Sequence, residues 1–295
     1  MDLAVRTDAF QSVDRASMTK TVCYNCGSGR HASYAEENGF SLVKCRECGL
    51  LFVDNPPEVH QIGDAVREGR HRGTRELKVT GRFNSAAIPE YVAMLEEVFG
   101  ADLVSKRTWL DVGAGHGEFV KTIDDVSAGA IAVRGMEPNV HKVESARKRG
   151  LNVSSFAIVT HEEKYDVVSM LDVYSHLPDP PSFIESLKHL LNAKGEILLQ
   201  TGDAANFSAR DQFRPFGLPD HLSFASEGIV VSILERLGFE IVKVRKYSYL
   251  RRDPKSIAKE IVKLFLPTYN SRLRFYFNWE KYCRTNMFIR ARLKN

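Results

Sequence analysis

The stretch that decides the fold is Leu110-Asp111-Val112-Gly113-Ala114-Gly115-His116-Gly117. Its first three residues end a short run, 108–112, that we expect to be a strand, and a run that we expect to be a helix follows the last glycine. The loop after the first strand of a parallel sheet must turn tightly and let a ligand approach its backbone, and glycine allows both. The pattern G-x-G-x-G alone is a weak signal, because dehydrogenases use a similar loop.

Three acidic residues indicate which class of ligand the loop binds. Asp111 stands before the loop, where a carboxylate can meet a ligand ammonium group, and Glu137 ends the next predicted strand, where an acid can accept both ribose hydroxyls. Glu118 occupies the third glycine position of the NAD fingerprint. A carboxylate there would repel a pyrophosphate, whereas a sulfonium ligand carries no phosphate. The pattern favours S-adenosylmethionine, with a nucleotide-binding oxidoreductase as the rival interpretation.

Strand-like and helix-like periods alternate after residue 108. Strands are expected at 108–112, 130–136, 165–171, 196–200, 239–244 and 286–293, and helices at 88–99, 118–123, 140–149, 182–192 and 226–237. Alternation of this length predicts an α/β fold, a Rossmann-like doubly wound and mostly parallel sheet.

Five segments together resemble the class I S-adenosylmethionine-dependent methyltransferases. The segments are 111–117, 137–139, 165–180, 220–224 and 237–240, and the resemblance covers roughly residues 85–295. It implies cofactor binding by the glycine loop, the ribose-binding acid and the exit of the fourth strand. The implied cofactor residues are Asp111, Gly113, Ala114, Gly115, Glu137, Pro138, Leu171 and Asp172, with an adenine wall at Ser155 and Phe156.

Four of the five cysteines form two matched pairs. The pairs are Cys23-x2-Cys26 and Cys45-x2-Cys48, and a glycine follows each pair. Two such knuckles present four thiolates at the spacing of a structural zinc ribbon, a closed site that should not be catalytic. The segment 44–53 resembles the ribbon found before some bacterial methyltransferase domains of sugar, surface-polysaccharide and natural-product pathways. Zinc modules at the same end also help ribosomal RNA methyltransferases bind RNA.

These features predict four segments. Residues 1–20 are expected to be a flexible leader, residues 21–57 the zinc ribbon, and residues 58–87 a linker with a little helix. The ribbon should end at Asn55-Pro56-Pro57, since a proline pair continues neither a strand ladder nor a helix. Residues 88–295 would form the methyltransferase domain, with a helical insertion at about 251–280.

Two histidines are candidate catalytic bases. Methylation of an alcohol is helped by a base that removes its proton. His176 lies just past the fourth strand, and His221 follows Asp220, whose carboxylate could orient an imidazole. The alternative for each is a role in shaping the pocket or in packing.

Composition and hydropathy predict a chain without a membrane-spanning segment. The chain is 43% hydrophobic and 26% charged, and no apolar run approaches the roughly 20 residues of a membrane span. Without a signal-peptide pattern, a cytoplasmic protein is expected. Between residues 251 and 295, twelve Lys/Arg face three Asp/Glu, which indicates either a solvated helical face or an anionic partner. The sequence gives no indication of the oligomeric state.

The predicted function is methyl transfer from S-adenosylmethionine to a small hydroxylated acceptor such as a sugar nucleotide, a glycan or a secondary metabolite. O-methylation is expected first, with C- or N-methylation open. The alternative is an RNA methyltransferase that uses the ribbon and the basic C-terminal region. The chain lacks the Asn/Asp-Pro-Pro-Tyr/Phe motif used on flipped bases. A third possibility is a binding protein that keeps the fold without catalysis.

Overall fold

A computed structural model describes residues 21–156, 158–248, 253–265 and 273–294. The expected flexible leader, residues 1–20, lies outside the described residues. So do parts of the expected helical insertion at 251–280. In the described part of the chain, no helix is long and apolar enough to cross a lipid bilayer.

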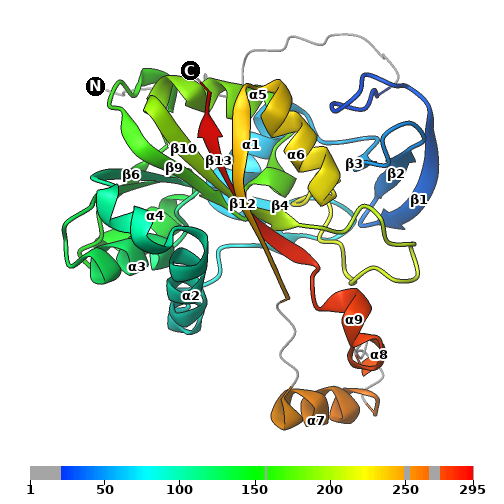
Figure 1. The fold of residues 1–295 in the computed structure, drawn as a ribbon. Helices are drawn as coiled ribbons and strands as arrows, with labels where there is room; N and C mark the ends of the chain where they lie inside the picture. Colours follow the sequence, from blue (N-terminus) through cyan, green and yellow to red (C-terminus); the bar gives the residue numbers. More distant parts are fainter. Residues whose placement is uncertain (1–20, 157, 249–252, 266–272, 295) are drawn as a thin grey trace, which may run out of the picture.

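A twisted seven-stranded sheet forms the centre of the molecule (Figure 1). In spatial order its strands are β12 (Phe239–Tyr247), β13 (Asn286–Leu293), β10 (Leu191–Gly202), β9 (Tyr165–Leu171), β6 (Thr108–Val112), β7 (Ala132–Glu137) and β8 (Val153–Ser155). All neighbours pair in parallel except β13, which is antiparallel to both β10 and β12. The predicted Rossmann-like, mostly parallel sheet is confirmed. Strand order reverses between β6 and β9, the point where such sheets bind ligands.

The two faces of the sheet bury different cores because side chains alternate along each strand. One face packs Trp109, Val167 and Phe288 against α2 (Ile88–Val98) and α3 (Glu118–Ser127). The other face packs Leu110 and Val168 against α5 (Pro180–Leu187) and α6 (Glu227–Arg236). The helix α4 (Val140–Arg147) covers β7 and β8.

Both ends of α5 differ from the sequence-based expectation. α5 begins at Pro180, where the Oδ1 of Asp179 accepts a hydrogen bond from the Ser182 amide, and ends at Leu187 instead of residue 192. Leu191 already belongs to β10, because the apolar residues after the helix are buried in the sheet. Ser226 is the N-cap residue of α6 as predicted, but its side chain makes no capping hydrogen bond. The amide of Glu227 donates to the side chain of Asp203.

The N-terminal segment forms a separate small sheet, whose fourth strand comes from a later part of the chain. Its strands β1 (His31–Glu37), β2 (Phe40–Cys45) and β3 (Leu51–Val53) are antiparallel. The short strand β11 (Ser223–Phe224) then pairs with β3, so that Ser223 lies opposite Phe52. Phe52 and its neighbours also share one buried core with α5 and α6. We refer to residues 21–57 as the cysteine module.

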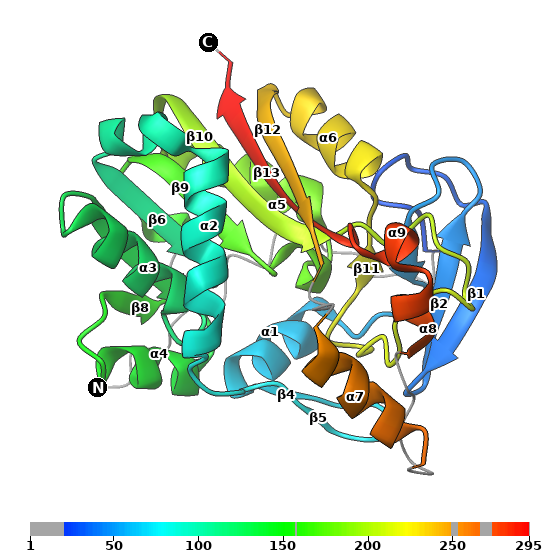
Figure 2. The same ribbon diagram turned by 60° about the horizontal axis from the view of Figure 1, so that its bottom comes forward.

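The segment 58–87, expected to be a linker with a little helix, holds more regular structure than that. It contains the helix α1 (Val59–Glu68) and a hairpin of β4 (Arg70–His71) and β5 (Leu77–Lys78). Val59, Ile62 and Val66 recur at helical spacing, and Gly69 ends the helix in a left-handed conformation. Figure 2 shows α1 and this hairpin lying below the sheet, beside α4.

Within the predicted insertion, three short helices are described before the final strand. They are α7 (Pro254–Lys263), α8 (Leu273–Phe277) and α9 (Trp279–Tyr282). In Figure 1 they lie below the sheet, and Phe275 and Tyr282 pack against Phe207 and Phe213 of the loop after β10. The final strand lies at residues 286–293 as expected.

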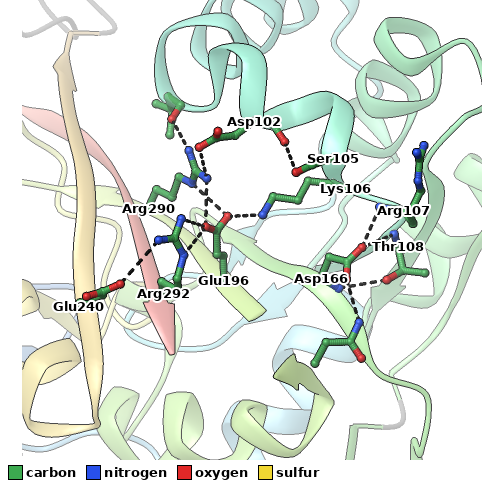
Figure 3. A network of polar contacts seen from close by, with 12 residues as sticks. Asp102, Ser105, Lys106, Arg107, Thr108, Asp166, Glu196, Glu240, Arg290 and Arg292 are labelled. Atoms are coloured by element: carbon green, nitrogen blue, oxygen red, sulfur yellow. Dashed lines mark hydrogen bonds and ion pairs between the residues drawn. The ribbon is translucent and has the colours of Figure 1, made fainter. Parts of the chain in front are cut away.

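A buried carboxylate holds together the end of the sheet opposite the switch point (Figure 3). Glu196 of β10 is fully buried and accepts hydrogen bonds from Arg290 and Arg292 of β13, and Lys106 forms an ion pair with it at 2.9 Å. Arg290 also donates to the last carbonyl of α2, that of Val98. Burial would raise the pKa of Glu196, but the cations around it lower it overall.

We expect Glu196→Gln to lower the free energy of unfolding by about 3–5 kcal/mol, because the buried Arg290 loses its buried counter-charge and keeps only the exposed Asp102, at 2.8 Å. Urea denaturation measures this. The lowered pKa also predicts that the ion pairs stabilise the protein above the ordinary glutamate pKa and are lost as the pH falls through the folded value. Glu240→Gln is the control, since Glu240 is 52% exposed and 3.6 Å from Arg292; it should change stability by less than about 0.5 kcal/mol.

Candidate functional site

The glycine loop connects β6 to α3 at the switch point. Gly113, Gly115 and Gly117 all have positive φ angles, of 75°, 58° and 91°. A Cβ atom on Gly113 would lie 2.4 Å from a methyl group of Val173, so no larger residue fits. The loop therefore keeps its backbone open toward the edge of the sheet.

A cavity of about 420 Å³ opens along this loop. Nine of the ten predicted cofactor residues line it: Asp111, Gly113, Ala114, Gly115, Glu137, Pro138, Phe156, Leu171 and Asp172. Ser155 does not. It is exposed at the end of β8 beside α4, because neighbouring residues at a strand end point to opposite sides. Phe156 alone represents the predicted adenine wall, stacked on Phe183 at a ring distance of 6.3 Å.

Glu137 braces the loop from the end of β7. Its side chain is 4% exposed, and its two oxygens accept the amide hydrogens of Gly115 at 2.8 Å and of Asn139 at 2.9 Å. A carboxylate has further lone pairs beyond the two that these bonds use. It can therefore hold the loop and still accept hydroxyl hydrogens from a ligand.

Asp111 is a buried carboxyl group under the same loop. It is 2% exposed and accepts a hydrogen bond of 2.6 Å from the hydroxyl of Ser169. Burial raises the pKa of Asp111 to about 7, and the negative charges of Glu137 and Glu118 add to the rise. A ligand ammonium group placed here would be matched by an ionised Asp111, which the apo protein disfavours.

The segment expected to be a linker closes one side of the cavity. Ile62, Val66, His71 and Val79 are part of its lining. The ring of His116, in the glycine loop, donates from Nε2 to the carbonyl of Thr80 at 2.8 Å. These lining residues were not among those expected from the sequence, although the helical spacing of the apolar residues in α1 is a readable signal.

A second cavity of about 460 Å³ adjoins the first. Asp172, His176 and His221 line both cavities. The rest of its lining is rich in hydroxyls, amides and phenyl rings: Ser175, Thr201, Gln212, Phe213, Phe216, Ser223, Phe224, Ser248, Thr285 and Asn286. Among its described lining residues there is no lysine or arginine. Asp172 has a φ of 55°, unusual for a residue with a side chain, at the point where the cavities meet.

Both predicted histidines lie at this junction, and their environments differ. Nδ1 of His176 donates to the carbonyl oxygen of Asp220 at 2.8 Å and lies 3.1 Å from its carboxylate. Burial would lower the pKa of His176, but the charge of Asp220 outweighs it and raises the pKa. His71 approaches the same carboxylate at 3.0 Å. Burial would raise the pKa of Asp220, but the two histidines outweigh it and lower the pKa.

His221 is held in its neutral form. Its Nδ1 donates to the carbonyl of Phe216 at 2.8 Å, which leaves the lone pair on Nε2. Burial, followed by the neighbouring His176 ring at 4.7 Å, lowers the pKa of His221 to about 4. At neutral pH, His221 can therefore accept a proton, whereas His176 is biased toward the charged form.

The four paired cysteines meet at one point of the cysteine module. Their sulfur atoms lie within 4.8 Å of one another, with Cys23 and Cys48 3.5 Å apart and Cys26 and Cys45 3.6 Å apart. These separations are too long for disulfides, which need about 2.05 Å. Each pair ends in a tight turn in which Gly27 or Gly49 donates back to the first cysteine of its pair.

Comparison with known proteins agrees with this geometry. A solved S-adenosylmethionine-dependent methyltransferase from Archaeoglobus fulgidus shares the fold, with a TM-score of 0.50, 18% identity, and coverage of 70% of this chain and 94% of that structure. The fold is thus that of the Rossmann-like methyltransferases. The family model described as "Methyltransferase domain" matches residues 83–244, more than half of the chain. The chain therefore belongs to this family and carries a methyltransferase domain at residues 83–244.

Curated relatives are more distant over the full length. A ubiquinone biosynthesis O-methyltransferase of Actinobacillus pleuropneumoniae is 32% identical over 106 residues, which cover 31% of this chain and 44% of the relative. Another, of Pseudoalteromonas translucida, is 27% identical over 171 residues, which cover 52% of this chain and 70% of the relative. The chain thus spans less than half of the length of the first.

We expect Asp111→Asn to stabilise the free protein and to weaken cofactor binding. A carboxyl group with a raised pKa binds its proton more tightly in the folded state, so stability falls as the pH rises from the ordinary aspartate value to about 7. At pH 8, Asp111→Asn should therefore raise the free energy of unfolding by about 2–4 kcal/mol.

Titration calorimetry of S-adenosylmethionine checks the binding half of this prediction. The wild type should bind about tenfold more weakly at pH 6 than at pH 8, since ionised Asp111 is needed, and Asp111→Asn should lose that dependence. Asp64→Asn, on the exposed side of α1, is the control. Equal affinity of Asp111→Asn and wild type at pH 8 would contradict the assignment.

Proposed function

We propose that this protein transfers a methyl group from S-adenosylmethionine to a hydroxyl group of a small acceptor. The observation that carries the proposal is the pair of adjoining cavities that share Asp172, His176 and His221. The first cavity has hydrogen-bonding groups that can hold the cofactor, and the second has room for the molecule that receives the methyl group. When bound, S-adenosylmethionine supplies an electrophilic methyl group on a sulfonium sulfur.

The residues of the first cavity would hold the cofactor by its three parts. Gly113 and Gly115 would leave room beside the methionine portion, whose ammonium group would face Asp111. Glu137 would accept the ribose hydroxyls, and Phe156 would pack on the adenine. Leu171 and Asp172 would then lie beside the reacting sulfonium, at the mouth of the second cavity.

The lining of the second cavity supports a small neutral acceptor. Hydroxyl and amide groups such as those of Thr201 and Gln212 can bind a polyhydroxylated molecule, and the phenyl rings of Phe213 and Phe216 can pack against its apolar faces. Glycans and hydroxylated secondary metabolites remain proposed classes, and so do sugar nucleotides that place only the sugar in this cavity and keep the anionic diphosphate outside it. An RNA acceptor is less well supported, because a polyanion would be expected to meet cations at this lining.

His221 is the base that the geometry favours. Methyl transfer is an in-line displacement, so the enzyme chiefly positions the acceptor oxygen and excludes water. The oxygen forms the new C–O bond, the sulfur keeps the electron pair of the broken C–S bond, and the hydroxyl proton passes to Nε2 of His221. His176, with its raised pKa, would instead orient the acceptor as a hydrogen-bond donor. The O-methyltransferase names of the curated relatives support transfer to oxygen.

We further propose that the cysteine module binds one structural zinc ion through Cys23, Cys26, Cys45 and Cys48. Four thiolates around a tetrahedral zinc, each about 2.3 Å from the metal, lie roughly 3.8 Å apart, close to the separations found here. All four positions are filled by the protein, so the metal would have no catalytic role. Residues 21–57 would then be a zinc module in front of the methyltransferase domain of residues 88–295.

A methyl-transfer screen tests the acceptor class. The purified protein is incubated with S-adenosylmethionine carrying a labelled methyl group and with sugar nucleotides, glycans, hydroxylated metabolites or total RNA. Label should enter one of the small-molecule classes. Label found in RNA alone would show that the proposed acceptor class is wrong.

His221→Asn tests the base. Its amide nitrogen can still donate to the Phe216 carbonyl, but the lone pair of Nε2 is gone. We expect the kcat to fall about 10²–10⁴-fold, with unchanged affinity for S-adenosylhomocysteine. His176→Asn is the comparison and should cost less. If His176→Asn abolished turnover and His221→Asn did not, the two roles would have to be exchanged.

Metal analysis tests the zinc proposal. Elemental analysis should find one zinc per chain, and Cys23→Ser should lose it and lower the melting temperature, since metal binding and folding are coupled. Cys283→Ser is the matched control, because Cys283 lies near α9 and outside the cluster. A zinc-free wild-type protein of undiminished stability would refute the site.

A further inference from the structure

We propose that Glu37, in the cysteine module, is a positioning residue for His221. The inference rests on the proposed function, in which His221 removes the acceptor's proton. It gives the N-terminal module a part in the chemistry of the acceptor site, beyond holding a metal.

Glu37 ends β1 and grips the loop that carries His221. Its Oε2 accepts the amide hydrogen of Phe216 at 2.8 Å, and its Oε1 accepts those of Gly217 at 2.7 Å and Leu218 at 3.2 Å. Three successive amides thus bind one carboxylate. Hydrogen bonds to an ionised acceptor are about twice as strong as neutral ones, so this segment is firmly held.

One peptide plane connects Glu37 to the imidazole. The carbonyl of Phe216 and the amide hydrogen of Gly217 belong to the same planar peptide unit and point in opposite directions. Glu37 binds the amide side at 2.7 Å, and Nδ1 of His221 binds the carbonyl side at 2.8 Å. Because the unit is rigid, fixing its amide side orients the carbonyl that selects the tautomer of His221.

The same turn places the neighbouring acid. The carbonyl of Gly217 accepts the amide hydrogens of Asp220 at 2.9 Å and of His221 at 3.1 Å. Gly217 has a φ of 79°, which suits glycine. The backbone that Glu37 holds is therefore the frame of both junction residues.

Other contacts of the module support this loop without reaching His221. Asn38 donates to the carbonyl of Leu218 at 3.0 Å, and the hydroxyl of Tyr24 donates to Ser223 at 3.0 Å. The pairing of β3 with β11 continues the same interface. Among these contacts, the one made by Glu37 is to the peptide unit whose carbonyl is hydrogen-bonded to the imidazole of His221.

The charge of Glu37 acts on His221 in addition to the hydrogen bonds that position the ring. The titratable groups acting on His221 are His176, Asp220 and Glu37, and the negative charge of Glu37 favours the protonated imidazole that forms when His221 accepts a proton. Removal of that charge should lower the pKa of His221 further. Base strength and orientation would then weaken together.

Glu37→Gln separates positioning from mere stability. Glutamine has nearly the same shape but no charge and a single acceptor oxygen. In the full-length protein we expect the kcat to fall about tenfold, with unchanged affinity for S-adenosylhomocysteine. Nuclear magnetic resonance of ¹⁵N-labelled histidine should show a changed tautomer balance and a lower pKa for His221. Glu36→Gln, the exposed neighbour on β1, should leave all three readouts unchanged.

A double-mutant cycle completes the test. In a His221→Asn background, Glu37→Gln should cause no further loss of kcat, since Glu37 acts through that ring. Glu37→Asp keeps the charge and should restore part of the turnover. Multiplicative losses in the cycle, or unchanged His221 resonances in folded Glu37→Gln, would overturn the inference.

These outcomes are distinct from failure of the proposed function. Full activity of His221→Asn would remove the base assignment. The resonances of His221 in Glu37→Gln would still report whether Glu37 sets the tautomer and the pKa of that ring.

Discussion

The structure depends on the backbone approach that glycine allows at the switch point of the sheet. β6 lies between β7 and β9, and the loop that leaves it must turn back over its own strand. At Gly113 the φ of 75° and the nearness of Val173 exclude any side chain. The cavity exists because this loop lies close to the edge of the sheet, and Glu137 holds it there by accepting the hydrogen of the Gly115 amide.

Two buried carboxylates show opposite uses of charge in this fold. Glu196 is surrounded by cations, which keep it ionised and tie β10 to β13. Asp111 has a hydroxyl as its nearest partner and other acids nearby, so burial dominates and its pKa rises. The first arrangement stabilises the sheet. The second stores unfavourable energy that a cationic ligand can release, which is how binding sites commonly differ from cores.

The junction of the two cavities is built from segments that are distant in the sequence. Asp172 and His176 follow β9, whereas His71 comes from the hairpin after α1. Asp220 and His221 belong to a loop whose backbone is gripped from the cysteine module. An imidazole with a raised pKa and a neutral imidazole can coexist at a ring distance of 4.7 Å because one has a carboxylate partner and the other a carbonyl. The module therefore helps to build the junction between the two cavities.

Much of this was determined by the sequence alone. Strands 108–112, 165–171 and 286–293, the glycine loop and the cysteine pairs depend on local periodicity and spacing, which short segments carry by themselves. Tertiary structure decided the rest. The orientation of Ser155 away from the cavity, the closing role of residues 58–87 and the different states of His176 and His221 depend on contacts across long sequence separations. No local pattern encodes a pKa that is set by burial and by a partner more than forty residues away, such as Asp220 for His176.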